Sequence, residues 1–160
     1  MVLAGEALSG RSGHEAGRQL LETLYRQQTG LPLPEIAITP RGKPYFINNP
    51  WQFSISHSKH HVFCALSRQP IGIDAEEQDR EISLALAQKI LSPTEYARYA
   101  EAPDKRQALL RLWVLKEAAA KATGEGLTGY PNRTDFSPDD PRIQILHGCF
   151  VAVVELTTDG

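Results

Sequence analysis

The alternation of apolar and polar residues along the chain predicts a mixture of helices and short strands. Between residues 13 and 29, apolar residues three and four apart form one stripe of an amphipathic helix: Ala16, Leu20, Leu21, Leu24 and Tyr25. Ser12, with Glu15 three residues later, provides a capping pair at the start of this helix. Gly30 is the residue type that ends a helix, so we expect the first helix over residues 13–29.

Short strands are predicted after this helix. Residues 36–38 are apolar, and the stretch 39–46 has the glycine and two prolines that are typical of an ordered loop. Residues 53–58 alternate, with Phe53 and Ile55 opposed to serines. Because successive side chains of a strand point to opposite faces, we expect one apolar and one hydroxyl-bearing face.

Two further apolar runs predict a β-hairpin. Residues 62–66 and 71–75 are separated by the turn sequence Ser67-Arg-Gln-Pro70. Gly72, inside the second run, indicates the close approach of another backbone or of a ligand.

The second half of the chain is predicted to begin with helices. Residues 82–91 are apolar on most sides, so we expect a buried helix there. The sequence Ser92-Pro-Thr-Glu95 provides the cap, the N1 proline and the reciprocal acid of a second helix. A third helix is expected from the capping residue Asp104 to about Thr123, where Gly124 ends it.

The chain is predicted to close with an antiparallel pair of strands. Residues 143–146 and 149–156 are apolar runs that turn at His147-Gly148. The order is therefore helix, strands, helices, strands, which is typical of an α+β fold.

Length and composition limit the class of protein. The chain has 160 residues, of which 41% are hydrophobic, as in one compact globular unit. A net charge of −2 gives no basic field, so no nucleic-acid partner is expected. The longest apolar stretch, Cys149 to Val154, is too short for a membrane span, and no signal peptide is recognisable. We therefore expect a soluble cytoplasmic protein in which Cys64 and Cys149 are buried, reduced thiols.

Two segments carry residues suited to chemistry on phosphates. Asp74 and Glu76 lie two apart on a predicted strand and share a face. Glu117 and Lys121 lie four apart on the predicted third helix and also share a face. Three converging carboxylates would bind a hard divalent cation, and a lysine beside them would bind phosphate oxygens. Each pair alone is also typical of an ordinary solvated surface.

Two other kinds of site have less support. Ser56 and His57 are adjacent, so they point to opposite faces of a strand, and no Gly-x-Ser-x-Gly elbow is present. A serine hydrolase is therefore not expected, although both residues at a strand end can donate to one phosphate. His57, His60, His61 and Cys64 lack the paired spacing of a zinc site, so solvent-exposed histidines in a turn are the favoured interpretation.

Three motifs, in order, resemble those of the 4′-phosphopantetheinyl transferases: Phe53-Ser-Ile-Ser-His-Ser58, Ile71-Gly-Ile-Asp-Ala-Glu76 and Trp113-Val-Leu-Lys-Glu-Ala-Ala-Ala-Lys121. With Gly42-Lys43-Pro44 and Ser92-Pro-Thr-Glu-Tyr96, they are similar to the longer, surfactin-synthetase type. The resemblance covers residues 14–137. It implies a monomer of two similar α/β halves, residues 1–70 and 71–160, packed as a pseudo-dimer with the active site between them.

The resemblance also implies an activity. The family transfers the phosphopantetheine arm of coenzyme A to a serine of an acyl or peptidyl carrier protein and releases adenosine 3′,5′-bisphosphate. By resemblance, Asp74, Glu76 and Glu117 would hold Mg²⁺ on the pyrophosphate of coenzyme A. Glu117 would also be the general base for the carrier serine, Lys121 would neutralise charge as the bond breaks, and Lys116 is a further catalytic candidate.

The resemblance also assigns residues to coenzyme A: Arg18 to the 3′-phosphate, Ser56 and His57 to phosphate binding, and Lys43 and Pro44 to the adenine. Longer relatives have a basic N-terminal segment that also binds coenzyme A, whereas residues 1–8 contain no Lys or Arg. We expect weaker binding here or a substitute such as Arg11. Two other functions stay open: a non-catalytic coenzyme A-binding relative, and another metal-dependent phosphoesterase.

Overall fold

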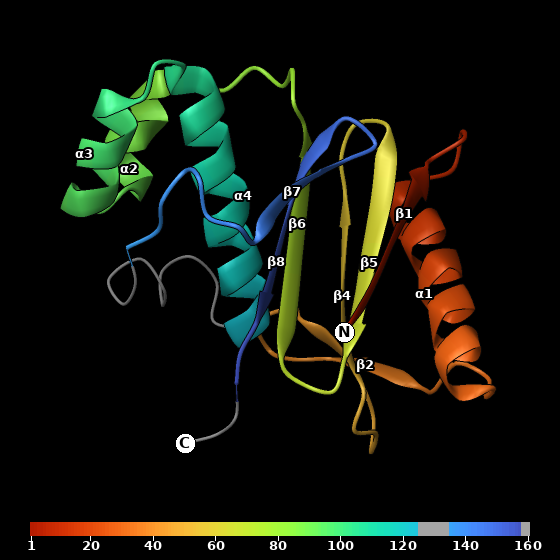
Figure 1. Ribbon diagram of the computed structural model, residues 1–160. Coiled ribbons are helices and arrows are strands. Elements are labelled where there is room, and N and C mark those ends of the chain that lie inside the picture. The colour runs from red at the N-terminus through yellow and green to blue at the C-terminus, as the bar shows by residue number, and fades with distance from the viewer. Residues whose placement is uncertain (125–134, 158–160) are drawn as a thin grey trace.

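The apolar stripes of the sequence pack as two helix-covered sheets in the computed structural model, which describes residues 1–124 and 135–157 (Figure 1). One sheet has the strand order β1-β5-β4, with β1 at Val2–Ala7, β4 at Gln52–His57 and β5 at His61–Ser67. The other has the order β6-β8-β7, with β6 at Ile71–Glu77, β7 at Ile143–Leu146 and β8 at Cys149–Glu155. All pairings in both sheets are antiparallel, and the α+β class is confirmed.

The helix α1 (Gly13–Thr29) covers the first sheet and has the predicted bounds. The Oγ atom of Ser12 accepts from the backbone N–H of Glu15 at 3.1 Å, and Gly30 ends the helix in the left-handed region at φ 71°. The predicted apolar stripe is buried against Phe53 and the interior side chains of β5. The pattern of apolar positions therefore located this element correctly.

The helix α4 (Lys105–Thr123) covers the second sheet, on the opposite side of the molecule from α1 (Figure 1). It begins at the cap Asp104 and ends at Gly124, as predicted. Three shorter elements precede it: the 3-10 turn η1 (Leu84–Leu86), α2 (Ala87–Ile90) and α3 (Pro93–Glu101). The predicted capping box of Ser92 and Glu95 is present at the start of α3.

Gly72 is the point where α4 lies directly on β6. A Cβ atom at this position would be 1.9 Å from the carbonyl oxygen of Ala118 and 2.4 Å from the backbone nitrogen of Ala122. Both atoms belong to the helix backbone, so a side chain could be accepted only by moving the helix. The predicted close approach of another backbone is confirmed, and it fixes the distance of α4 from the sheet.

Gly72→Ala is therefore expected to lower the free energy of unfolding by at least the ~1–3 kcal/mol that is typical of overpacking. Gly17→Ala is the control, because a Cβ atom there would meet only the side chain of Ile55. Urea denaturation of both variants measures the difference. Equal losses of stability in the two variants would contradict the assignment of a special backbone contact to Gly72.

A row of serine hydroxyls on β4 joins the two sheets. The Oγ atoms of Ser54 and Ser56 accept from the backbone N–H groups of Ile73 and Ala75 of β6, each at 3.1 Å. These N–H groups belong to the edge of β6 that does not pair with β8. The alternation of the 53–58 segment thus gives one apolar face for α1 and one hydroxyl face for β6.

The predicted hairpin of residues 62–66 and 71–75 is wrong. β5 pairs with β1 and β4, whereas β6 pairs with β8 from the end of the chain. Both strands are buried on both faces, so their pattern does not say which strands they pair with. The short separation of the two strands in sequence favoured a hairpin. In the structure, β6 instead contacts the serine side chains of β4.

The predicted helix of residues 82–91 is confirmed only in part, because residues 84–90 are helical, and its predicted burial is wrong. Only the two short turns η1 and α2 form there, Leu84 is 45% exposed, and Ala87 alone is buried. Leu91 is extended and leads directly into Ser92, the N-cap of α3. The start signal of α3 therefore limits the length of the preceding helix.

Two strands were not expected from the sequence. β1 has a weak alternation, and all of its residues are partly or fully exposed. β3 (Pro44–Phe46) lies inside the stretch predicted as a loop and pairs with β2 (Ile36–Ile38). Gly42, at φ 91°, provides the left-handed turn between them.

Candidate active site

Asp74 of β6 is the centre of the candidate site. Its Oδ1 atom accepts from the hydroxyl of Ser56 and from the Nζ atom of Lys121, both at 3.2 Å. Its Oδ2 atom is buried and has no hydrogen-bond partner among residues 1–124 and 135–157. A buried carboxylate oxygen without a partner is costly, so a cation or a donor from a ligand would stabilise it.

Lys121 connects α4 to this carboxylate. Its Nζ atom donates to the carbonyl oxygen of Ile73 at 3.0 Å as well as to Asp74. The Lys121 side chain is still 36% exposed. The ammonium group therefore neutralises Asp74 and remains accessible to a bound anion.

Glu76 and Glu117 complete the set of carboxylates. Burial raises the pKa of both groups, and the charge of Asp74 raises them further. The effect of Asp74 on both indicates that the three carboxylates share one electrostatic environment. In the described structure, Glu76 is paired with Arg80 of the following turn, at 2.5 Å.

These residues fit a hard divalent cation by their chemistry. Three carboxylates offer only oxygen ligands, and Asp74 Oδ2 is an acceptor without a donor in the part of the chain that the structure describes. The described oxygens of these three carboxylates are not as close to one another as ligands around an ion, and Glu76 is paired with Arg80. Holding a cation would therefore require Glu76 to exchange Arg80 for the ion.

A cavity of about 250 Å³ lies beside these groups. Its wall includes residues of β3, β4 and α4 and the turn before β3: Gly42, Lys43, Pro44, Ser54, Glu117 and Lys121. The Lys43 Nζ atom donates to the carbonyl oxygen of Ala122 at the end of α4, at 3.0 Å, and burial lowers the pKa of Lys43. The structure thus brings Lys43 and Pro44 together with Glu117 and Lys121.

Lys116 does not belong to this site, which corrects the prediction of a catalytic role. It is 1% exposed, and its Nζ atom donates to Oε1 of Glu95 at 2.7 Å. The other oxygen of Glu95 accepts from the backbone N–H of Phe136 at 2.9 Å. Neighbouring helix residues point about 100° apart, so Lys116 faces α3 while Glu117 faces the cavity.

Ser56 and His57 do not face one common point. Ser56 lies between β4 and β6 and supports Asp74. His57 is exposed and lies against Gly13, where a Cβ atom would be 2.3 Å from the imidazole ring. The predicted sharing of one phosphate is therefore not evident in this arrangement, and His57, at the end of β4, lies beside the first residue of α1 instead.

The two arginines near α1 differ in availability. Arg18 is partly exposed, and no described residue forms an ion pair or hydrogen bond with it. Arg11 donates to the carbonyl oxygens of Ala7 and Leu8 at 2.8 Å and to Gln19 at 2.9 Å. Arg11 thus holds the turn between β1 and α1, which weakens its case as a substitute ligand for coenzyme A.

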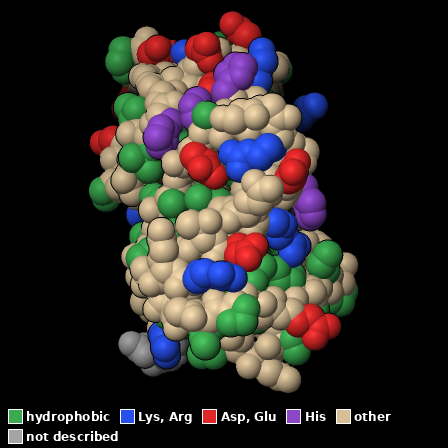
Figure 2. All heavy atoms as spheres, turned by 90° about the vertical axis from the view of Figure 1, so that its right-hand side faces the viewer, with side chains coloured by type: hydrophobic (Ala, Val, Ile, Leu, Met, Phe, Trp, Pro, Cys, Tyr) green, Lys and Arg blue, Asp and Glu red, His purple; other side chains and the backbone are tan. Residues whose placement is uncertain are grey.

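The face that carries α1 has no charged patch of one sign. Figure 2 shows Lys and Arg side chains interspersed with Asp and Glu, and histidines gathered toward its upper end. This distribution agrees with the net charge of −2 and favours specific contacts over a general field.

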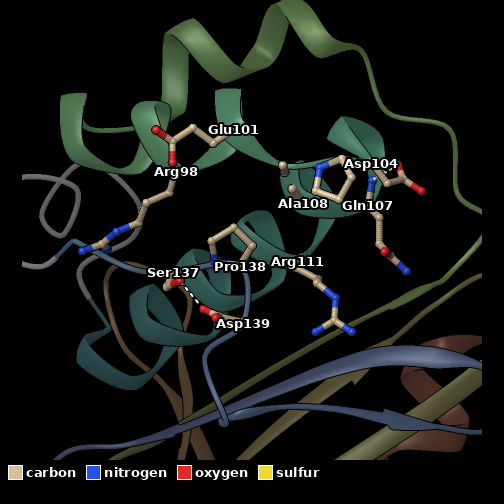
Figure 3. A pocket seen from close by; sticks show the side chains of 11 residues that line it. Arg98, Glu101, Asp104, Gln107, Ala108, Arg111, Ser137, Pro138 and Asp139 are labelled. Atoms are coloured by element: carbon tan, nitrogen blue, oxygen red, sulfur yellow. Dashed lines mark hydrogen bonds between the residues drawn. The ribbon is translucent and has the colours of Figure 1, made fainter.

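A larger hollow of about 510 Å³ lies elsewhere, between α3, α4 and residues 137–139 (Figure 3). Its charged side chains have mixed signs, and both of its arginines have existing partners. Arg98 donates to the carbonyl oxygen of Phe136 at 2.8 Å, and Arg111 lies 4.6 Å from the ring centre of Phe150. This hollow therefore lacks the convergent groups of the smaller cavity.

Comparison with known proteins identifies the family. Residues 70–151 match the model of the 4′-phosphopantetheinyl transferase superfamily, which is half of the chain, so the protein belongs to this superfamily. The matched segment contains Asp74, Glu76, Glu117 and Lys121.

Among the described residues, none of the helices has the length and apolar character needed to cross a membrane.

Curated relatives are of the surfactin-synthetase type. The chain is 35% identical over 117 residues to the 4′-phosphopantetheinyl transferase Sfp of Bacillus subtilis (strain 168), covering 70% of this chain and 52% of Sfp. It is 34% identical over 117 residues to psf-1 of Bacillus pumilus, covering 70% and 50%. For HetI of Nostoc sp. the identity is 33% over 122 residues, covering 70% and 52%. The chain thus spans about half the length of the curated relatives it matches.

Proposed function

We propose that the protein transfers the 4′-phosphopantetheine arm of coenzyme A to a serine of an acyl or peptidyl carrier protein and releases adenosine 3′,5′-bisphosphate, with Mg²⁺ as cofactor. The observation that carries the proposal is Asp74: its buried Oδ2 atom has no partner among the described residues, and its Oδ1 atom accepts from Lys121, which lines the cavity together with Glu117. A role in phosphate chemistry explains why the fold keeps this costly carboxylate next to an accessible lysine.

Asp74, Glu76 and Glu117 would hold the cation. When bound, it offsets the negative charge of the pyrophosphate of coenzyme A. The side chains of β6 and α4 provide these three carboxylates, and Ser56 with Lys121 fixes the orientation of Asp74 through its Oδ1 atom.

Glu117 is assigned as the general base. Its carboxylate lines the cavity and accepts the proton of the carrier serine hydroxyl, directly or through a water. The serine oxygen then bonds to the phosphorus atom of the phosphopantetheine, and the bond from that phosphorus to the bridging oxygen of the pyrophosphate breaks. Lys121 stabilises the charge that develops on the departing phosphate of adenosine 3′,5′-bisphosphate.

Coenzyme A is proposed to extend from this cavity toward α1. Lys43 and Pro44 line the cavity and would flank the adenine, which supports their predicted role. Arg18, which has no described partner, would contact the 3′-phosphate, and His57, at the end of β4 and against Gly13 of α1, would bind phosphate. Arg suits a dianionic phosphate, because its guanidinium group donates two parallel hydrogen bonds.

Arg18→Ala is expected to weaken the binding of coenzyme A by ~10–100-fold, which corresponds to the ~1.5–3 kcal/mol of a charged hydrogen bond. Dephospho-coenzyme A, which lacks the 3′-phosphate, should bind equally to both proteins. Arg26→Ala is a matched control, because Arg26 lies on the same helix and is paired with Glu22. Calorimetric titration with both ligands tests the assignment, and equal losses for both ligands would contradict it.

We also propose that residues 1–70 and 71–160 are two halves of a pseudo-dimer within a monomer. The strand orders β1-β5-β4 and β6-β8-β7 match and support this proposal. In each sheet, the strand that comes last along the chain lies in the middle. In each half, a long helix also follows the first strand of the sheet and precedes the other two strands.

The free thiols of Cys64 and Cys149 support a reducing, cytoplasmic location.

The reaction type is tested by using chromatography to measure the release of adenosine 3′,5′-bisphosphate from coenzyme A. The proposal expects release only when Mg²⁺ and an apo carrier protein are both present. Release without a carrier would indicate a phosphoesterase. Binding of coenzyme A without release, with several carriers, would indicate a non-catalytic relative.

A further inference from the structure

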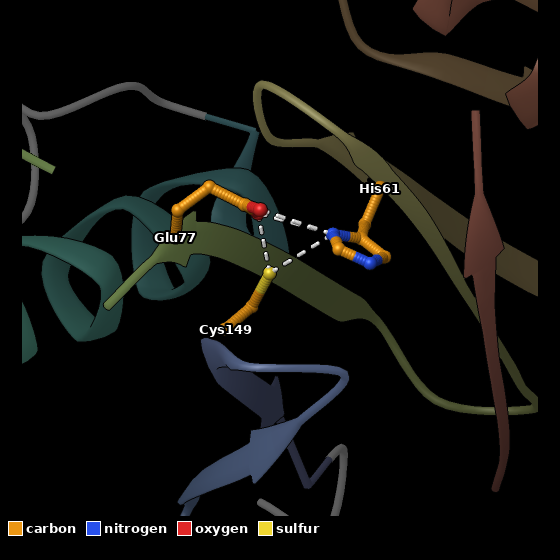
Figure 4. A group of neighbouring side chains, drawn as sticks. All are labelled: His61, Glu77 and Cys149. Atoms are coloured by element: carbon orange, nitrogen blue, oxygen red, sulfur yellow. Dashed lines mark hydrogen bonds and ion pairs between the residues drawn. The ribbon is translucent and has the colours of Figure 1, made fainter. Parts of the chain in front are cut away.

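His61 of β5, Glu77 of β6 and Cys149 of β8 meet at one point (Figure 4). The Nδ1 atom of His61 is 3.1 Å from Oε1 and 3.2 Å from Oε2 of Glu77. The Sγ atom of Cys149 is 3.7 Å from the same nitrogen and 2.6 Å from Oε2 of Glu77. The three groups are far apart in sequence, so their convergence is a property of the fold.

This cluster is separate from the candidate active site. Glu77 follows Glu76 directly, and successive strand residues point to opposite faces. Glu76 is on the face of Asp74, whereas Glu77 reaches toward the β4–β5 turn, where Ser58 donates to its Oε2 atom. The family resemblance and the proposed reaction assign no role to any of the three residues.

A thiolate, an imidazole and a carboxylate are the ligand types that zinc takes in proteins. Bond lengths of ~2.0–2.3 Å in a tetrahedron place ligand atoms roughly 3.3–3.8 Å apart. The distances from His61 to Glu77 and to Cys149 are close to this range. The distance from Cys149 to Glu77 is shorter, and rotation of the Glu77 side chain would open it.

The cluster is partly open to solvent, so a cation can enter it. Cys149 is fully buried, while the side chains of His61 and Glu77 are 21% and 14% exposed. His147 of the β7–β8 turn stacks on His61, with ring centres 5.7 Å apart, and limits its rotation. The site thus has a buried sulfur, an oriented imidazole and one side open to water.

The geometry points to a zinc site formed by His61, Glu77 and Cys149, with water in the fourth position. Binding replaces the thiol proton of Cys149, which passes to solvent, and forms the sulfur–zinc bond. Since β5 belongs to one sheet and β6 with β8 to the other, the ion would link the two sheets at the end opposite to Ser67. It would stabilise the fold rather than take part in transfer.

Cobalt is the probe that reports sulfur ligation. The metal-stripped protein, titrated with Co²⁺, is expected to develop a thiolate-to-cobalt charge-transfer band at one equivalent, and Zn²⁺ should abolish this band. Cys149→Ser should lack the band, while Cys64→Ser, which changes the other buried thiol, should keep it. Asp74→Asn should also keep it, which separates this site from the carboxylate site.

Zinc affinity, measured by competition with a chromophoric chelator, provides the second readout. His61→Ala and Glu77→Gln are expected to lose at least the ~10–100-fold that even outer-shell changes cause. His60→Ala, a change at the exposed residue directly before His61, should bind zinc like the unchanged protein. Zinc should also raise the Tm of the unchanged protein and not that of Glu77→Gln.

The proposal is overturned if no band forms in the unchanged protein, or if the band persists in Cys149→Ser. It is also overturned if Glu77→Gln and His61→Ala bind zinc as tightly as His60→Ala. In those cases Glu77 is only the acceptor of hydrogen bonds from Ser58, His61 and Cys149. Glu77→Gln keeps the thiol and the size of the side chain, so this outcome does not depend on whether Cys149→Ser folds.

Discussion

Glu117→Gln is expected to lower the rate of phosphopantetheine transfer by about 10²–10⁴-fold. Glutamine keeps the size of the side chain and removes both the base and one carboxylate ligand. Glu117 is partly exposed on α4 and lines the cavity, so the fold should tolerate the change. Single-turnover kinetics with a saturating carrier protein measure the chemical step directly.

Gln107→Glu is a suitable control for charge on the same helix, because Gln107 lines the other, larger hollow near the start of α4. Its transfer rate should stay within a few-fold of that of the unchanged protein. Near-normal turnover of Glu117→Gln with Mg²⁺ present would refute the assignment of Glu117 as the base. Circular dichroism spectra of Glu117→Gln and of this control, compared with each other, show whether a loss of rate is caused by unfolding.

Lys116→Met should instead destabilise the protein, by ~3–5 kcal/mol, because it removes the counter-ion of the buried Glu95 carboxylate. Both side chains are almost fully buried, at 2% and 0% exposure. The double variant Lys116→Met with Glu95→Gln should recover most of this loss. Glutamine is neutral and keeps a carbonyl oxygen to accept from the backbone N–H of Ser92 or of Phe136.

Urea denaturation of the single and double variants measures the coupling between the two residues. If Lys116 were catalytic, the double variant would be stable and inactive. The structure predicts that the folded double variant retains transfer activity, since Lys116 faces α3 and not the cavity. Loss of activity in a folded double variant would restore Lys116 to the catalytic set.

The sequence predicted those parts of the fold that local signals determine. The bounds of α1 and α4 follow from Ser12, Asp104 and the two glycines that end the helices. The serines of β4 could be assigned to one face by their alternation, but their partners on β6 could not. A period of two identifies a face of a strand and not the strand it lies against.

Long-range pairing explains the errors. The pairing of β6 with β8 instead of β5 depends on a strand more than seventy residues later. The buried position of Lys116 did have a signal, because residues 108–122 of α4 are apolar on nearly all sides. A helix of this kind is buried all round, so a lysine within it requires a buried partner. Glu95 was already assigned as a capping residue, and its second role was missed.

The cluster of His61, Glu77 and Cys149 had no signal in the sequence. His61 was grouped with His60 and Cys64 by proximity along the chain, whereas β-strand alternation and sheet pairing bring it to Glu77 and Cys149 instead. Asp74 and Glu76 could be assigned to one face, because they are two apart on one strand. The hydrogen bonds that Asp74 accepts from Ser56 and Lys121 are visible only in the tertiary structure.

The most direct test of the proposed function is the intact mass of an apo acyl carrier protein after incubation with this protein, coenzyme A and Mg²⁺. The account predicts a gain of one phosphopantetheine group, which is absent with EDTA and with Asp74→Asn. Ser137→Ala, a change in the larger hollow, should leave the gain unaltered. No gain with any of several carrier proteins, under conditions in which coenzyme A still binds, would contradict the account.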